Sequence, residues 1–326
     1  MDNAKNRAVP PFLLQPVLKD YVWGGERLKA GYGKQISLPI VAESWECSVH
    51  PDGESVIASG AHAGSTLAAV LDRHPELLGY GRKQNREFSL LVKLIDAREM
   101  LSVQVHPDDA YAQGNEDGPG KTEAWVILEC EPESFVYHSF HSPVTKEEIR
   151  HSLAAGSLTD LLRRIPVHRH DVIYIPAGVP HAVGSGILLA EVSQNSNSTY
   201  RLYDHGRMPV DGKKRPLHVD RALDVSVLTP VDTKPSGCGM ISKSSCHMLR
   251  QLVKCMHFTM QMLTLHGSYP LPVNMLALVA LCTDGMVTLE DGCGSLPLGK
   301  GGCAFIPANQ DSLCLQGTGR VLLISE

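Results

Sequence analysis

The sequence predicts a mainly β protein, because short apolar runs recur between turn-forming residues. The 326 residues include 29 glycines and 21 prolines, which are scattered along the chain. They separate apolar runs of strand length, such as residues 88–95, 124–128 and 171–175. Runs of this kind, bounded by Gly and Pro, are typical of strands joined by tight turns. A chain of this length can also bury a sizeable core.

Helical patterns are confined to a few places. We expect helical insertions over about residues 62–80 and 143–165, and a short helix over 219–223. In the second insertion, Thr145 precedes Glu147 and Glu148, an order that favours a helix N-terminus. Four leucines then follow at helical spacing and give an apolar face.

A domain boundary is expected near residue 240. Residues 229–245 are rich in Pro, Gly, Ser and Lys, which is the composition of a linker. We therefore expect a catalytic β domain over 1–235, with the helical insertions, and a second β domain over 240–326.

A weak internal repeat suggests that the two domains are barrels of similar type. DVIYIPAGVPH, which ends at His181, resembles GCAFIPANQDS, which ends at Ser312. His181 in the first copy thus corresponds to a serine in the second. If the repeat is real, the 240–326 domain lacks metal ligands.

Composition narrows the classes of partner. The formal net charge is −5 and 20% of the residues are charged, so no global positive charge favours nucleic acid or an anionic membrane. Residues 1–11 are polar and contain proline, which predicts no signal peptide, and no apolar window approaches the length of a membrane span. Nine widely spaced cysteines without a CxxC motif favour reduced thiols and a cytoplasmic location. The oligomeric state cannot be read from these features.

The first chemical signal is LSVQVHPDD, residues 101–109. Gln104 and His106 are two residues apart on a predicted strand, so their side chains share one face, while Val103 and Val105 share the other. Two metal-capable side chains on one face indicate a functional interior position. An ordinary histidine at an exposed edge is the competing interpretation.

Four further residues extend this signal. Glu123, in GKTEAW, opens an apolar run, and Lys121 shares its face. His181 follows the turn Pro-Ala-Gly and opens another strand. Glu191 stands inside the apolar run LLAEV, where an unpaired carboxylate would be costly. Taken singly, each could be a surface or structural residue. Two His and one Glu together form a familiar catalytic zinc set with an open coordination position.

The last segment is QNSNSTYRLYDHGR, residues 194–207. It contains Arg201 and Arg207 with Asp204 between them. Arginine offers a planar, permanently charged fork that suits phosphate or an enediolate oxygen. A solvated loop with a surface ion pair is the alternative.

These motifs resemble the type I mannose-6-phosphate isomerases, particularly their short bacterial form. QVHPDD, GKTEAW and IPAGVPHAV carry the resemblance, together with AEVSQNSNSTYRLYD. YVWGGERL and ESWECSVHPDG, nearer the start, are also similar, so the matching blocks run from about residue 12 to 207. The resemblance implies two cupin-type (jelly-roll) β-barrels with a small helical insertion. It also implies a sugar-phosphate substrate and one zinc ion per chain.

The resemblance further implies a role for each residue. Zinc ligands would be His106, Glu123, His181 and Gln104. Arg201 would be the catalytic arginine, and Glu191 or a zinc-bound hydroxide would carry the proton. Lys121 and Ser102 would contact the substrate, with Lys121 near the phosphate. The reaction would interconvert mannose 6-phosphate and fructose 6-phosphate through a cis-enediol.

Other functions are compatible with part of this pattern. Two His and one carboxylate also describe a non-haem iron site, so an iron oxygenase or an isomerase of another sugar phosphate is the main alternative. A non-catalytic sugar-binding cupin is the third, and it would predict an incomplete ligand set.

Overall fold

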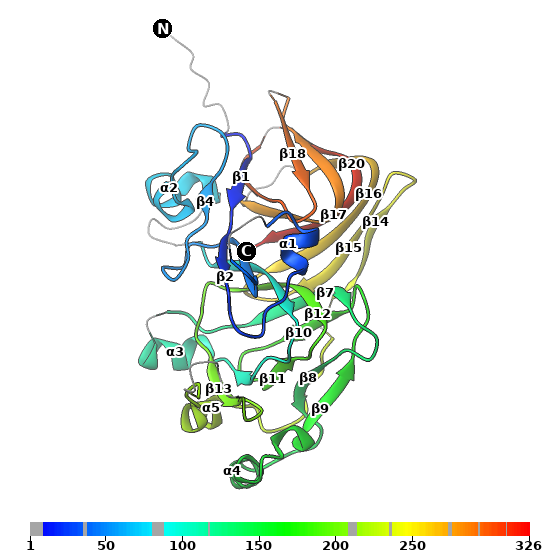
Figure 1. The fold of residues 1–326 in the computed structure, drawn as a ribbon. Coiled ribbons are helices and arrows are strands. Elements are labelled where there is room, and N and C mark those ends of the chain that lie inside the picture. The colour runs from blue at the N-terminus through cyan, green and yellow to red at the C-terminus, as the bar shows by residue number, and fades with distance from the viewer. Residues whose placement is uncertain are drawn as a thin grey trace.

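The computed structural model describes residues 9–34, 38–79, 88–116, 118–207, 214–234, 237–272, 276–292, 294–310 and 312–326. Residues 80 and 235, at the ends of the first expected insertion and the first expected domain, lie outside these ranges. The fold is mainly β, as expected, and its strands form three sheets packed as layers (Figure 1). The described strands pack as jelly-roll sheets and do not close into hydrogen-bonded cylinders.

The six-stranded sheet is the central layer. In spatial order its strands are β10 (Val172–Ile175), β7 (Glu123–Cys130), β12 (Ile187–Gln194), β5 (Leu90–Ala97), β3 (Glu43–Cys47) and β2 (Val17–Lys19). Every residue of β5 and β12 is buried. Because both faces of this sheet are covered, its strands are mostly apolar, and the charged residues that they carry, such as Lys93 and Glu191, are buried.

The five-stranded sheet covers one face of the central layer. Its strands are β13 (Tyr200–Tyr203), β6 (Val103–Val105), β11 (His181–Val183), β8 (Phe135–Phe140) and β9 (Leu162–Pro166). Ile95, Trp125 and Ile127 from the central sheet pack there with Val136 and Val183. The functional residues described below lie between these two sheets.

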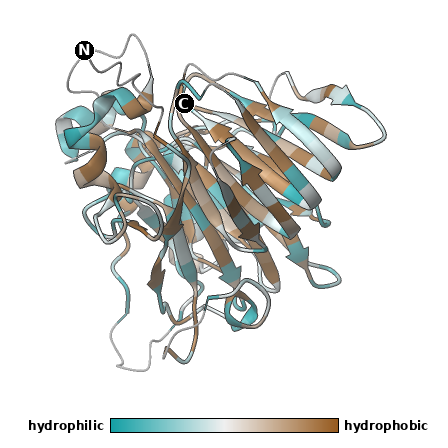
Figure 2. Ribbon diagram, turned by 90° about the horizontal axis from the view of Figure 1, so that it is seen from above, coloured by the Kyte–Doolittle hydropathy of each residue, from teal (hydrophilic) through white to brown (hydrophobic). Residues whose placement is uncertain are grey.

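The nine-stranded sheet covers the other face of the central layer. Its main path is β14 (Gly239–Lys243), β15 (His247–Lys254), β16 (Thr259–Leu271), β20 (Leu313–Ser325), β17 (Leu278–Glu290), β19 (Cys303–Ile306), β1 (Phe12–Gln15) and β4 (Val56–Ile57), with β18 (Ser295–Gly299) on β17. Two strands from the start of the chain thus belong to the C-terminal sheet. Figure 2 shows the hydrophobic residues gathered along the strands and the hydrophilic ones in loops and on helices.

The sequence repeat has a structural counterpart. The offset that relates the two repeated segments also relates β10 to β19, and it carries His181 at the start of β11 onto Ser312, just before β20. The domain boundary near residue 240 stays a prediction. Strands β1 and β4 precede this boundary in the sequence, but they belong to the nine-stranded sheet, whose other strands follow it.

Short helices cover the outside of the sheets. They are α1 (Arg27–Gly31), α2 (Leu67–Arg73), η1 (Pro75–Leu78), α3 (Asp109–Asn115), α4 (Lys146–Ala155), η2 (Leu158–Leu161) and α5 (Val219–Val225). Thr145 caps α4 in a capping box with Glu148. The helix is shorter than the expected 143–165 because Gly156 ends it in the left-handed conformation, with φ 71°. Residues 162–166 form strand β9.

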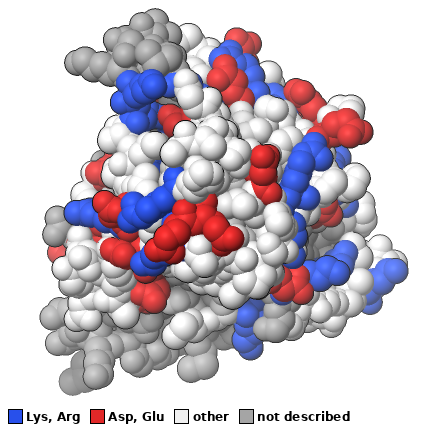
Figure 3. All heavy atoms as spheres, turned by 90° about the horizontal axis from the view of Figure 1, so that it is seen from below, with Lys and Arg blue, Asp and Glu red and all other residues white. Residues whose placement is uncertain are grey.

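Exposed ion pairs join α4 to α5, for example Lys146 to Asp224 at 3.2 Å and Arg150 to Asp220 at 2.7 Å. Figure 3 views the molecule from below, and on that face Lys and Arg are interspersed with Asp and Glu. Among the described residues, no helix is long and apolar enough to cross a membrane.

Candidate metal centre and active-site cavity

Two rows of side chains face each other between the six-stranded and five-stranded sheets. On the five-stranded sheet, Arg201, Gln104, His181 and His138 occupy directly opposite positions on β13, β6, β11 and β8. Directly opposite residues of antiparallel strands point to the same face of a sheet. The predicted alternation on β6 is thereby confirmed: Val103 and Val105 pack on the outer face instead.

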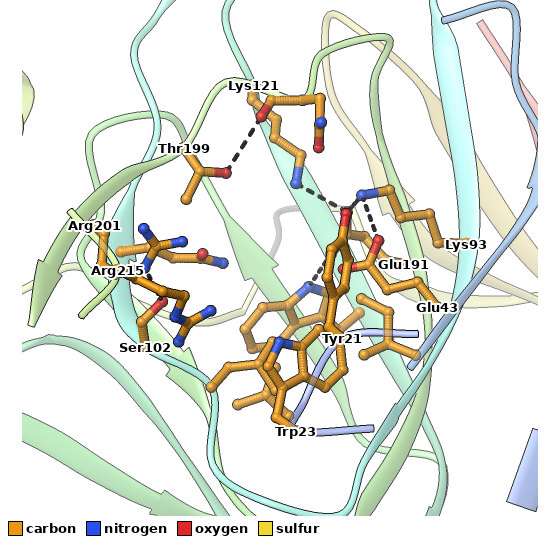
Figure 4. A pocket seen from close by; sticks show the side chains of 16 residues that line it. Tyr21, Trp23, Glu43, Lys93, Ser102, Lys121, Glu191, Thr199, Arg201 and Arg215 are labelled. Carbon is orange, nitrogen blue, oxygen red and sulfur yellow. Dashed lines mark hydrogen bonds and ion pairs between the residues drawn. The ribbon is translucent and has the colours of Figure 1, made fainter. Parts of the chain in front are cut away.

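The facing row comes from the central sheet. Trp45, Lys93, Glu191 and Trp125 lie directly opposite one another on β3, β5, β12 and β7. A cavity of about 220 Å³ lies between the two rows (Figure 4). Residues that the sequence analysis selected and that line it are Ser102, Gln104, Lys121, Glu191 and Arg201.

His106, Glu123 and His181 come together beside this cavity. Nε2 of His106 lies 3.5 Å from Glu123 Oε2, and Nε2 of His181 lies 3.3 Å from Glu123 Oε1. One donor atom from each residue lies within 4.8 Å of the others, and all three side chains are buried. They are brought together from β7, β11 and the end of β6. This is the only such group among the described residues, and all three of its members precede residue 240.

Hydrogen bonds orient both imidazoles for ligation. Nδ1 of His106 lies 2.7 Å from the Ser198 carbonyl oxygen, and Nδ1 of His181 lies 2.8 Å from that of Val179. A carbonyl oxygen only accepts, so each Nδ1 carries the proton and each Nε2 presents a lone pair toward Glu123. Metal-binding histidines commonly have such an outer hydrogen bond.

The trio also leaves polar atoms unsatisfied. Glu123 Oε2 is paired with the Lys121 ammonium at 2.6 Å, but His106 Nε2 and Glu123 Oε1 are buried and make no hydrogen bond within the described chain. Buried polar atoms are rarely left in this state. A bound cation would satisfy all of them, so the residues present fit a metal ion.

Gln104 completes the group from the next strand. Its Nε2 lies 3.3 Å from His181 Nε2. A half-turn of the terminal amide would place the oxygen of Gln104 at that point instead. Its amide oxygen is therefore within reach of a shared ion.

Pairing of opposite charges keeps Lys121 and Glu123 ionised although both are buried. Burial lowers the pKa of His106 and of His181, which keeps both imidazoles neutral and able to bind a metal. Burial alone would also lower the pKa of Lys121, but Glu123 and Glu191 outweigh burial and raise it. Burial would raise the pKa of Glu123, whereas Lys121 and His181 lower it. The Lys121 ammonium lies 2.6 Å from Glu123 Oε2.

Glu191 is held by donors on both of its oxygens. Lys121 Nζ donates to Oε1 at 2.9 Å, and the Trp125 indole donates to Oε2 at 3.2 Å. Lys93 Nζ lies 3.9 Å from Oε1 and also donates to Glu43 at 3.3 Å. The carboxylate inside LLAEV is thus paired, as the cost of an unpaired buried charge requires.

Two guanidinium groups form the opposite wall (Figure 4). Arg201 Nε donates to Ser102 Oγ at 3.3 Å, and its Nη1 donates to the Pro216 carbonyl at 3.0 Å. Arg215 Nε donates to Asp204 at 2.9 Å. Burial and then the neighbouring Arg215 lower the pKa of Arg201. Asp204 therefore pairs with Arg215, while both arginines line the cavity.

Several residues that line the cavity were not predicted as site residues from the sequence. Lys93 and Glu43 lie on β5 and β3, while Tyr21 and Trp23 come from the loop before α1. Lys93 interrupts an apolar run just as Glu191 does, so the same signal could have identified it. Arg215 lies beyond the matched motifs, and no local pattern distinguishes it from a surface arginine.

The fold and the buried group together define a cupin-type protein with a candidate metal centre. Residues 12–125 match the family described as phosphomannose isomerase type I, catalytic domain, and residues 248–325 match the mannose-6-phosphate isomerase cupin domain. The chain belongs to the type I mannose-6-phosphate isomerase family.

Individual relatives agree with this family. The chain is 34% identical to mannose-6-phosphate isomerase ManA of Bacillus subtilis over 94% of its length and 96% of the relative. It is 34% identical to the Streptococcus mutans mannose-6-phosphate isomerase over 91% and 92%. The crystal structure of the B. subtilis mannose 6-phosphate isomerase superposes with a TM-score of 0.91 at 31% identity, covering 97% of this chain and all of that one.

Proposed function

We propose that this chain interconverts mannose 6-phosphate and fructose 6-phosphate. The observation that carries the proposal is the buried trio of His106, Glu123 and His181, whose unsatisfied atoms lie beside a cavity lined with acidic and cationic groups. Family membership supplies the substrate class. A cytoplasmic location and a single zinc ion per chain belong to the same proposal.

His106, Glu123 and His181 would hold the zinc ion, with the amide oxygen of Gln104 as a fourth ligand. When bound, the ion supplies Lewis-acid polarisation of the substrate oxygens. Two imidazoles, a carboxylate and an amide suit zinc, although the same donors also accept iron. Outer hydrogen bonds from the imidazoles to Ser198 and Val179 would keep the ligand geometry fixed.

The reaction moves a proton from C2 of the open-chain aldose to C1, and a hydroxyl proton from O2 to O1. We assign the carbon proton to Glu191, whose carboxylate borders the cavity and accepts a hydrogen bond from Lys121. Removing the C2 proton leaves a cis-enediol bearing negative charge on oxygen. Arg201, on the facing wall, would stabilise that charge.

Substrate positioning is assigned to residues at the cavity margin. Lys121 and Ser102 are proposed to contact the sugar phosphate. Arg201 and Arg215 add positive charge on the same side as Ser102. Binding energy from the phosphate would then place C1 and C2 beside Glu191.

The direct test is a coupled isomerase assay on mannose 6-phosphate, with metal analysis of the purified protein. We expect turnover, about one zinc per chain, and loss of turnover on chelation with recovery on adding zinc. Turnover of another sugar phosphate alone would change the substrate assignment. Iron with oxygen uptake would favour an oxygenase, and sugar binding without turnover would favour a binding protein.

A further inference from the structure

Trp125 occupies the position next to Glu191 in the row on the central sheet. The two residues are directly opposite each other on β7 and β12, and the indole Nε1–H donates to Glu191 Oε2 at 3.2 Å. Glu191 Oε1 is already bound by Lys121 at 2.9 Å. The indole and the ammonium therefore restrain different oxygens of one carboxylate.

The indole is itself fixed in place. Trp125 is 1% exposed, and its neighbours Ala124 and Val126 anchor β7 from the other face of the sheet. Its ring meets the His181 ring edge to face, with centroids 5.4 Å apart and planes at 78°. One side chain thus contacts both the carboxylate and a residue of the candidate metal centre.

An indole N–H has properties that suit this position. It donates a directional hydrogen bond but does not ionise at physiological pH, so it cannot neutralise a carboxylate or take its proton. An ammonium in place of the indole would hold Glu191 more strongly, but it would weaken the carboxylate as a base beyond the effect of Lys121 at 2.9 Å and Lys93 at 3.9 Å. The indole can restrain the carboxylate while leaving it able to accept a proton.

A related pairing occurs on β3, where an indole and a lysine share one carboxylate oxygen of Glu43. The Trp45 indole donates to Glu43 Oε2 at 2.7 Å, and Lys93 Nζ donates to the same oxygen at 3.3 Å. Each of these buried carboxylates is bound by one lysine and one indole. The repetition indicates that the pairing orients charged groups at the cavity and does not merely fill space.

We propose that Trp125 is a positioning residue that aims the carboxylate of Glu191 at the substrate. This inference rests on the proposed function, in which Glu191 carries the proton. Trp125 acts through Glu191 and takes no proton itself. The specific claim is that its N–H, more than its bulk, sets the rate of proton transfer.

The test is a double-mutant cycle between Trp125→Phe and Glu191→Ala in the zinc-loaded enzyme. A hydrogen bond to a charged group supports a fall in kcat of about ten- to one hundred-fold for Trp125→Phe. We expect KM, zinc content and the thermal unfolding midpoint to stay close to those of the wild type. In the Glu191→Ala background, Trp125→Phe should change the residual kcat by less than about twofold, because its target is gone.

A second variant separates the N–H from the shape of the ring. Site-specific 3-benzothienylalanine at position 125 keeps the bicyclic ring and replaces N–H by sulfur. It should lower kcat as Trp125→Phe does, and it should increase the loss of substrate C2 deuterium to solvent because the carboxylate is less restrained. This variant also tests the role of the indole N–H if Trp125→Phe does not fold.

The outcomes separate this role from the proposed function. A wild-type enzyme without isomerase activity would refute the function, and the role of Trp125 with it. An active wild type with full kcat in the benzothienylalanine variant would refute the role alone. Equal kcat losses from Trp125→Phe with and without Glu191 would show that Trp125 acts by another route.

Discussion

Replacing Lys121 by methionine tests whether this lysine holds the site together. The Lys121 ammonium is 5% exposed and lies 2.6 Å from Glu123 and 2.9 Å from Glu191, which are 0% and 4% exposed. Lys121→Met keeps the length of the side chain but removes the charge between two buried carboxylates. Removing one partner of a buried pair leaves an uncompensated charge, which costs about 3–5 kcal/mol.

The metal-free variant should therefore unfold at a lower temperature than the metal-free wild type. At about 2 °C per kcal/mol for a chain of this size, the expected shift is about 6–10 °C. The same substitution at Lys146, whose 3.2 Å pair with Asp224 is exposed, is the matched control. An exposed pair contributes at most about 1 kcal/mol, so Lys146→Met should shift the midpoint by about 2 °C or less.

The pH dependence follows from the direction of the pKa shifts. Because the pKa of Lys121 is raised on folding, its contribution to the free energy of unfolding is complete at neutral pH and is lost only as pH rises through the folded value. The lowered pKa of Glu123 contributes stability that is lost only as pH falls through its folded value, below the usual range. In Lys121→Met, burial without the lysine raises the pKa of Glu123, so the stability difference between wild type and variant should grow as pH rises and narrow as pH falls and the carboxylate takes up a proton.

Differential scanning calorimetry in a chelator, and again with zinc, provides the assay. Zinc at about a thousand times its Kd adds about 4 kcal/mol, and in Lys121→Met it also compensates Glu123. The zinc-induced shift should thus be larger in the variant than in the wild type, and KM for mannose 6-phosphate should rise. A metal-free midpoint within about 2 °C of the wild type would refute the charge argument. An unchanged KM would remove Lys121 from the substrate contacts.

Four other substitutions separate ligation, chemistry and local backbone geometry. His106→Ala and His181→Ala should each lose zinc and activity together, by metal analysis and the coupled assay; full activity with stoichiometric zinc would exclude them as ligands. Arg201→Ala should keep its zinc and lose kcat by about one hundredfold or more, and a near-normal kcat would exclude Arg201 from the chemistry. Gly120→Ala should weaken zinc binding, measured by competition with a chelator, because its Cβ would lie 2.4 Å from the carbonyl carbon of Asp108 and displace the segment that leads to Glu123. Zinc affinity equal to that of the wild type would show that the backbone adapts.

The class of fold could be predicted from the sequence because Gly and Pro form the turns at which strands end. It did not reveal that the central sheet is covered on both faces. A run such as residues 88–95 reads as a buried strand, but the layers that cover it come from distant parts of the chain. The end of α4 was also misplaced. Three of the four leucines continue the helical spacing beyond Gly156, but this glycine adopts the left-handed conformation and ends the helix.

The candidate ligands could be predicted from the sequence for a different reason. His106, Glu123 and His181 are polar residues at strand ends, where alternation alone places them on an inner face, and the family resemblance then grouped them. Arg215 could not be predicted as a site residue from the sequence, because only the tertiary fold brings it next to Ser102 and Arg201. The contact between Trp125 and Glu191 depends on strand register, which local patterns do not determine.

The pairing of β1 with β19 affects how the chain can fold during synthesis. Phe12 lies opposite Phe305, so β1 needs a strand that is translated almost 300 residues later. At about 5–20 residues per second, roughly 15–60 s separate the appearance of the two strands at the ribosome. Although β4 can pair with one edge of β1 much sooner, the edge that pairs with β19 must remain open for that interval, which makes it a natural binding site for chaperones on the nascent chain.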